Sequence, residues 1–560
     1  MSGQRTRTVT ILAQDPSVRD RSGEILKATV QVPWEDLEPG PTGHRVQVVD
    51  YDATTRTLYR PAGVRARDFA DGSDILDDPG FHARNAYALV MRTLHRFERA
   101  LGRRVTWGFP AHQLKVVPHA FEEANAFYSR DAEALLFGYY RGRTGLVFTG
   151  LSQDIVVHET THALLDGLRS RFMAPSSPDQ AAFHEAFADI VALLSVFSLR
   201  DVLRFLIDRG RRSRSGLVDK DSVTSDRLAE GWLLGLADEM KPERDVGRVN
   251  ALRRSVELEP RTSILREPEF LEPHRRGEVL VAAVMQALLA VWERRLTSLG
   301  TIRGRFLDAR RVAEEGAEIA DVLLTMAIRA LDYTPPIHVG FGDYLSALLT
   351  ADTEVRADDQ LGVREALLDR FAAFGIRPAS GRRDGLWRRP QHELVHDGVR
   401  FGSLQTDEIE MFRLIWRNRD RLRLVPTAHT HVASVRPCVR TSPDDGLPLR
   451  ETVTECLQSV SIAASELGDH GLEKPADMPG DTPVVLEGGS TLILDEYGRL
   501  KYEIYQRLPG TGDGSGNAQR RLEYLWRHGH YEPGGSALSD LATVHRIRAG
   551  AGTRERDEVW

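Results

Sequence analysis

Two short segments carry residues whose types and spacing could build a metal site. The first, HETTH, spans residues 158–162, and the second, HEAFAD, spans residues 184–189. Histidines four apart on a helix project from one face, so His158 and His162 can bind one metal while Glu159 activates a water molecule on it. Glu185 can add a third ligand and leave the fourth position to water, as in catalytic zinc sites. Together the segments predict a zinc hydrolase.

Both segments are predicted to lie on helices, which would position these side chains. Ser152 is a suitable N-cap for a helix over 153–168, and Ser177 followed by Pro178 marks the start of the second helix. Glu185 and Asp189 lie four residues apart and share a face of that helix. Asp189 can therefore accept a hydrogen bond from the second nitrogen of a ligating histidine while Glu185 binds the metal.

A second HExxH pattern occurs at residues 392–396, where the surroundings differ. It lies between Pro390 and the turn pair Asp397-Gly398, which leaves too few residues for a helix. A strand running into an Asp-Gly hairpin is favoured there. Because no Glu-x-x-x-Asp follows at a suitable distance, we interpret this copy as a coincidence.

The bulk composition is that of a globular protein with several domains. The chain has 560 residues and a formal net charge of -7, and no basic block points to nucleic acid or a membrane surface as a partner. Its two cysteines fit a reducing compartment, and the N-terminus lacks a signal-peptide core. A cytoplasmic location is expected, with leaderless export as the alternative.

The pattern along the chain predicts an α+β fold of five parts. The segment RPASGRRDGLWRRPQ, rich in proline, glycine and arginine, marks the end of the catalytic unit. The predicted parts are an N-terminal arm with one strand (1–44), a β-rich lobe with a long helix (45–150), a helical lobe with the zinc site (151–380), a β-containing C-terminal domain (381–510), and a linker with a short helical tail (511–560).

Four separated motifs, in the same order and with similar spacing, resemble the thermolysin-like metallopeptidases. They are NAFY at 125–128 with Phe137-Gly138 after a short gap, GLSQDIVVHETTHALLDGL, HEAFADI, and HRRGEV at 274–279, the last being similar to a segment of the related fungalysins. The resemblance covers residues 45 to about 375. It implies a β-rich N-terminal lobe and a helical C-terminal lobe, with zinc at the floor of the cleft between them.

The resemblance also implies roles for individual residues. His158, His162 and Glu185 would be zinc ligands, and Glu159 the general base. Asn125 and Ala126 would lie along the cleft edge, where an extended peptide can pair as an added strand. His274 would donate to the developing oxyanion. Arg253, which loosely resembles the arginine that binds a substrate carbonyl, has Arg254 as a nearly equal match.

The chain departs from the family pattern at two positions. Met173 stands where the family usually has a tyrosine that donates to the oxyanion, so His274 and the metal would carry more of that stabilisation, or another tyrosine would replace it. Val196 replaces an acidic calcium ligand of the family, and this replacement argues against the paired calcium site of secreted members. The other acidic position, Asp154, remains.

These features predict a zinc-dependent endopeptidase that acts on a peptide or protein substrate. One alternative is a zinc-stabilised protein-binding module with weak or lost activity. An aminopeptidase is a further alternative, although no segment for gripping a free amine is visible. The C-terminal region from about 385 is expected to cover the cleft, select the substrate or recruit a regulatory partner. His429 and His431, with Cys438 nearby, could bind a second metal, but an exposed strand edge is the favoured interpretation.

Overall fold

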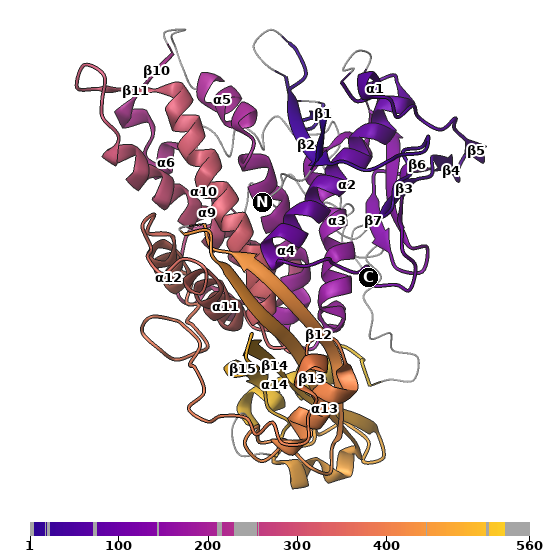
Figure 1. The fold of residues 1–560 in the computed structure, drawn as a ribbon, viewed down its shortest axis with the longest axis vertical. Helices are drawn as coiled ribbons and strands as arrows, with labels where there is room; N and C mark the ends of the chain where they lie inside the picture. Colours follow the sequence, from indigo (N-terminus) through magenta and orange to yellow (C-terminus); the bar gives the residue numbers. More distant parts are fainter. Residues whose placement is uncertain are drawn as a thin grey trace.

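Helices and strands both build the molecule, so the fold class is α+β, as predicted. The computed structural model describes residues 5–16, 18–19, 23–70, 75–142, 145–209, 216–228, 255, 257–443, 445–510 and 515–531. Figure 1 shows the N-terminal strands on one side, a group of long helices beside them, and a second sheet at the far end of the molecule.

The N-terminal segment is a pair of strands, not an arm with a single strand. β1 (Thr6–Leu12) runs antiparallel to β2 (Lys27–Pro33), the strand that the sequence predicts. The prediction misses β1, in which Val9 and Ile11 on alternate positions are both buried in the main core. The two strands therefore belong to the packed body of the protein.

The β-rich lobe is built on a mixed sheet with the strand order β3-β6-β8-β7, in which β9 also pairs with β8. Its strands are β3 (Val46–Val48), β6 (Leu114–Glu122), β7 (Ala126–Ser129), β8 (Ala134–Arg141) and β9 (Leu146–Phe148). β4 (Tyr51–Asp52) pairs with β5 (Thr57–Leu58), and α1 (Ala66–Ala70) follows. The predicted long helix is α2 (Pro79–Leu101), capped by Asp78. β7 lies at the sheet edge, antiparallel to β8.

The helical lobe carries the metal-site motifs on two buried helices. α3 (Gln153–Leu168) has the predicted bounds and α4 (Pro178–Phe197) begins where predicted, and the Ser177 hydroxyl accepts from the Gln180 amide at 3.1 Å. Ser152 precedes α3, but its hydroxyl bonds Asp154 at 2.8 Å, so the predicted side-chain cap is wrong. α4 is long and apolar enough to cross a membrane by composition alone, yet it is mostly buried, as a core helix is.

Further helices pack around this pair. They are α5 (Arg200–Arg209), α6 (Ser225–Leu228), α9 (Pro273–Ser298), α10 (Ala309–Ala330), α11 (Phe341–Thr353) and α12 (Val363–Ala373), with the short strands β10 (Leu217–Asp219) and β11 (Phe306–Asp308) between them. α9 approaches α4 closely at Gly277, where an added Cβ would lie 3.3 Å from the Ala182 carbonyl oxygen and 3.4 Å from the Ala186 Cβ. The first turns of α9 therefore lie beside the part of α4 that carries Glu185.

The C-terminal part contains an antiparallel sheet in sequential order. Its strands are β12 (His429–Thr441), β13 (Pro448–Ala463), β14 (Pro483–Asp495) and β15 (Leu500–Gln506), flanked by α13 (Glu408–Arg417) and α14 (Ser515–Arg527). A tight turn at Glu496 to Gly498 joins β14 to β15. The look-alike pattern at 392–396 is neither helix nor strand, so the predicted strand is wrong, while the predicted turn at Asp397-Gly398 is present.

Buried charges join this sheet to the helical lobe. Asp332 receives two hydrogen bonds from Arg103 of the β-rich lobe, both at 2.6 Å, and also pairs with Arg440 of β12. Arg169, directly after α3, pairs with Glu455 of β13 at 2.7 Å. Val453, Ile493 and Ile504 of the sheet belong to the same hydrophobic core as α3 and α4. The apolar core thus continues across the predicted boundary at 380/381.

Candidate metal centre

Three buried side chains from α3 and α4 converge on one point. The His158 Nε2 lies 3.5 Å from one carboxylate oxygen of Glu185, and the His162 Nε2 lies 3.4 Å from the other. The two imidazole nitrogens are 2.8 Å apart. Among the described residues this is the only group of three or more metal-ligating side chains whose ligand atoms lie close together.

The spacing of these atoms fits a tetrahedral zinc ion. Two ligands each about 2.0–2.1 Å from a shared ion lie about 3.3–3.4 Å apart at the tetrahedral angle. Both histidine-to-glutamate distances agree with that value. The histidine pair is about 0.5 Å closer, a difference that small side-chain rotations can remove. Two imidazoles and one carboxylate form a donor set suited to zinc.

Asp189 holds the first histidine from the opposite side of its ring. The His158 Nδ1 lies 2.8 Å from the Asp189 Oδ1. A hydrogen bond from Nδ1–H to this carboxylate leaves the Nε2 lone pair directed at the metal position, because a neutral imidazole carries one proton. The structure thus brings Asp189 to the place that the Glu-x-x-x-Asp spacing predicts.

Glu159 is fully buried between α3 and the sheet edge. Its carboxylate accepts a hydrogen bond from the backbone amide of Tyr128 on β7 at 3.2 Å. The Tyr128 hydroxyl donates to Asp166 of α3 at 2.8 Å, and the Arg130 Nε donates to the same carboxylate at 2.8 Å. The β7 segment is thereby bonded to α3 at two points, Glu159 and Asp166. These bonds hold the predicted base next to the metal ligands.

Asn125 and Ala126 lie where β7 begins. The Asn125 Oδ1 accepts from the Ala126 amide at 2.9 Å, and its backbone carbonyl accepts from Gly138 at 2.9 Å. An added Cβ at Gly138 would lie 2.2 Å from the Glu123 carbonyl oxygen, so only glycine permits this approach. Asn125 and Ala126 are therefore placed at the edge of the sheet that contacts the metal helix.

His274 lies in the first turn of α9, at the end that packs beside Glu185. Its Nδ1 is 2.5 Å from the carboxylate of Glu272, which also caps the helix by accepting from the His274 and Arg275 amides. Burial alone would raise the pKa of Glu272, but the His274 hydrogen bond and charge lower it to about 2. The carboxylate is ionised at neutral pH and orients the imidazole.

The remaining predicted positions have different outcomes. Arg253 and Arg254 lie outside the described residues. Phe172 and Met173 are buried in the main core, so neither places a donor in the site. The Tyr128 hydroxyl is engaged by Asp166 and does not replace the tyrosine expected at position 173.

Two further sets of residues bear on metal binding, namely the calcium positions Asp154 and Val196 and the group His429, His431 and Cys438. Val196 is a buried core residue, and Asp154 accepts from the Ser152 hydroxyl. His429 and His431 lie on β12 with ring centroids 5.5 Å apart, whereas Cys438 is buried against the Glu451 carbonyl. Among the described residues these three side chains do not form a metal-binding group.

The sequence prediction misses one neighbour of the ligands. The ring of His184 stacks on that of His162, with centroids 4.5 Å apart and planes 6° from parallel. His184 directly precedes Glu185, but its position on the helix surface gives no indication of which ring it would contact. Only the packing angle between α3 and α4 reveals the stack.

Comparison with known proteins adds no family assignment, because no family model and no curated protein sequence matches the chain.

Proposed function

We propose that the protein is a zinc-dependent endopeptidase with a two-lobed, thermolysin-like catalytic unit. The observation that carries this proposal is the convergence of His158, His162 and Glu185 with Glu159 on the same turn of α3. A structural zinc site has no use for a buried carboxylate beside an open coordination position. Asp189 orients the ligand His158, and the edge strand β7 offers backbone groups with which an extended peptide substrate can pair.

When bound, zinc supplies Lewis acidity that polarises a carbonyl group and makes water a stronger nucleophile. Glu159 takes the proton of the attacking water and delivers it to the leaving amine, so that a poor leaving group departs neutral. The Tyr128 amide holds the Glu159 carboxylate in place during both transfers. The Asp189 carboxylate, 2.8 Å from the His158 Nδ1, favours the tautomer that carries its proton on Nδ1.

His274 is assigned to stabilise the negative charge that develops on the carbonyl oxygen. The ionised Glu272 accepts from its Nδ1–H, so donation toward substrate requires the imidazolium form, in which the Nε2 also carries a proton. The substrate is a peptide or unfolded protein segment in extended form, placed along the edge formed by Asn125, Ala126 and β7.

The second candidate is a zinc-stabilised protein-binding module with weak turnover. Met173 favours it, because the buried thioether cannot replace a hydroxyl donor, and loss of one such donor lowers turnover by about 100-fold to 1000-fold. Both candidates bind zinc, so metal content alone does not separate them.

The deciding experiment compares wild-type protein with Glu159→Gln on an unfolded casein substrate, with and without a chelator. We expect chelator-sensitive cleavage by the wild type, and a rate about 100-fold to 10,000-fold lower for the variant at equal zinc content, because the amide cannot accept the proton. Glu318→Gln, on the exposed side of α10, is the matched control and keeps full activity. Equal cleavage by Glu159→Gln removes this residue as the base, and no cleavage by zinc-loaded wild type favours the binding module.

A further inference from the structure

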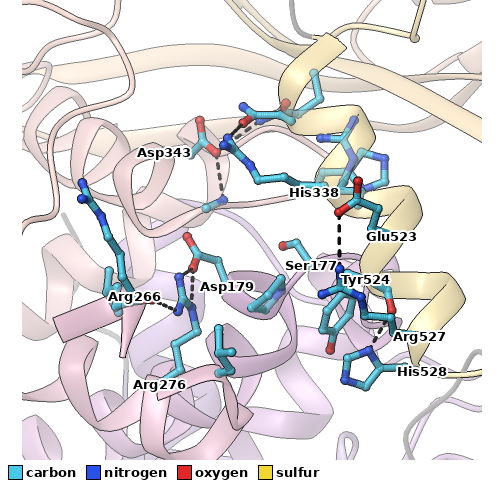
Figure 2. Close-up of a pocket in the computed structure, with 18 residues that line it drawn as sticks. Ser177, Asp179, Arg266, Arg276, His338, Asp343, Glu523, Tyr524, Arg527 and His528 are labelled. Atoms are coloured by element: carbon cyan, nitrogen blue, oxygen red, sulfur yellow. Dashed lines mark hydrogen bonds and ion pairs between the residues drawn. The ribbon is translucent and has the colours of Figure 1, made fainter. Parts of the chain in front are cut away.

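A cavity of about 810 Å³ lies between the N-terminal end of α4 and the C-terminal helix α14. Figure 2 shows Asp179 and Ser177 on one wall, Arg266 and Arg276 beside them, and Glu523, Tyr524 and Arg527 on α14 opposite. The volume is within the range of sites for small molecules, about 300–1,000 Å³. The site is separate from the metal centre, since Asp179 precedes Glu185 by six residues, or about 9 Å along the helix.

The cavity wall is rich in positive charge. Five arginines line it against three carboxyl groups. The arginines are Arg266, Arg276, Arg520, Arg521 and Arg527, and the carboxyl groups are Asp179, Asp343 and Glu523.

The three carboxyl groups already have partners. Asp179 binds Arg276 at 2.5 Å and accepts from the Phe341 amide at 3.1 Å. Glu523 lies 3.7 Å from Arg527. Burial raises the pKa of Asp343 to about 7, and its carboxyl also accepts from the Gly340 amide at 2.8 Å. Little negative charge is left to neutralise the other arginines.

Three arginines have no counter-ion in the wall. Among the described residues, no carboxylate lies within ion-pair distance of Arg266, Arg520 or Arg521, and Asp343 acts on Arg521 only from beyond that distance. Arg521 is half-buried, and burial lowers its pKa to about 10. A cation held this way is costly unless an anion offsets it.

The remaining wall combines polar side chains with an apolar and aromatic part. Leu265 and Leu271 line the side near α9, and the Tyr524 ring lies on α14 beside His528, with centroids 4.2 Å apart. Such a wall suits the organic part of a ligand, while the arginines suit its anionic groups.

We propose that this cavity is a binding site for a small organic anion that carries phosphate or carboxylate groups. The ligand's charges pair with Arg521, Arg520 and Arg266, and its organic part contacts Tyr524 and the two leucines. Because α14 belongs to the C-terminal region and α4 carries Glu185, the bound anion connects the C-terminal region to a metal-ligand helix.

The test is calorimetric titration of the full-length protein with inorganic phosphate, adenosine monophosphate, succinate and uncharged adenosine. We expect at least one anionic probe to bind and adenosine to bind far more weakly. Phosphate-bearing and carboxylate-bearing ligands are distinguished by comparing adenosine monophosphate with succinate. Affinity should fall as salt concentration rises, because charge pairing carries the binding.

Arg521→Gln should weaken binding of the anionic probe about tenfold or more, since it removes a charge-assisted hydrogen bond. Arg266→Gln, at an exposed position in the cavity wall, provides a second variant with little risk to folding. Arg310→Gln on α10, 74% exposed and outside the cavity, is the matched control. Absence of binding by all three anions overturns the proposal, as does unchanged affinity in both cavity variants. The readout needs no catalytic activity, so the result is independent of the proposed peptidase function.

Discussion

The substitution Asp332→Asn tests how the C-terminal sheet is attached to the catalytic unit. Asp332 is buried and pairs with Arg103 of the β-rich lobe and Arg440 of β12. Its loss leaves Arg103, only 8% exposed, without an ion-pair partner among the described residues, whereas Arg440 keeps Glu451. Breaking a buried pair by removing one partner costs about 3–5 kcal/mol. Because Arg440 retains a carboxylate, we expect the lower end, about 3 kcal/mol.

The effect should depend on pH with a defined sign. Burial alone would raise the pKa of Asp332, but the guanidinium groups of Arg103 and Arg440 hold it well below its usual range. A carboxyl whose pKa is lower in the folded state stabilises the fold above its unfolded pKa, about 3.9, and loses that contribution as pH falls toward the folded value. The difference between wild type and Asp332→Asn is therefore full at pH 7 and shrinks below about pH 4.

Urea denaturation followed by tryptophan fluorescence measures this difference, with Asp321→Asn as the control. Asp321 also pairs with an arginine, Arg96 at 2.9 Å, but its side chain is 59% exposed. Because this carboxylate is exposed to water, the pair should contribute about 0–1 kcal/mol, so the control should stay close to wild type. If Asp332→Asn destabilises the protein no more than Asp321→Asn does at pH 7, the buried ion pairs do not join the two parts energetically.

Two further predictions concern the metal helix and the C-terminal region. Asp189→Asn should lower zinc affinity about 10-fold to 100-fold in a competition titration with a chromophoric chelator, because the amide holds the His158 tautomer less well; unchanged affinity contradicts this role. A chain ending at residue 384 should be insoluble when expressed, since Arg169 and Asp332 lose the partners Glu455 and Arg440. A soluble, active truncated protein would contradict this stabilising role.

Helical periodicity is local, and the sequence alone was sufficient for it, whereas the predicted side-chain cap is present at Ser177 and absent at Ser152. The spacing of His158, Glu159 and His162 within one helix predicts a shared face, and Ser177 with Pro178 predicts the start of the next helix. Glu185 and Asp189 are four residues apart on one helix, so the sequence also predicts that their side chains share a face. The short pattern at 392–396 could be rejected in the same way, because Pro390 and Gly398 leave no room for a helix.

Contacts between distant segments were decided only by the tertiary structure. The Tyr128 amide reaches Glu159, and His184 stacks on His162, because of the angles at which β7 and α4 meet α3. Arg169 pairs with Glu455, 286 residues later, which no spacing rule connects. Such contacts depend on how distant segments pack against each other. Local sequence patterns do not specify that packing. The sequence therefore determined which residues could form the metal site, and the packing of α3, α4 and the sheet edge decided which other residues hold them.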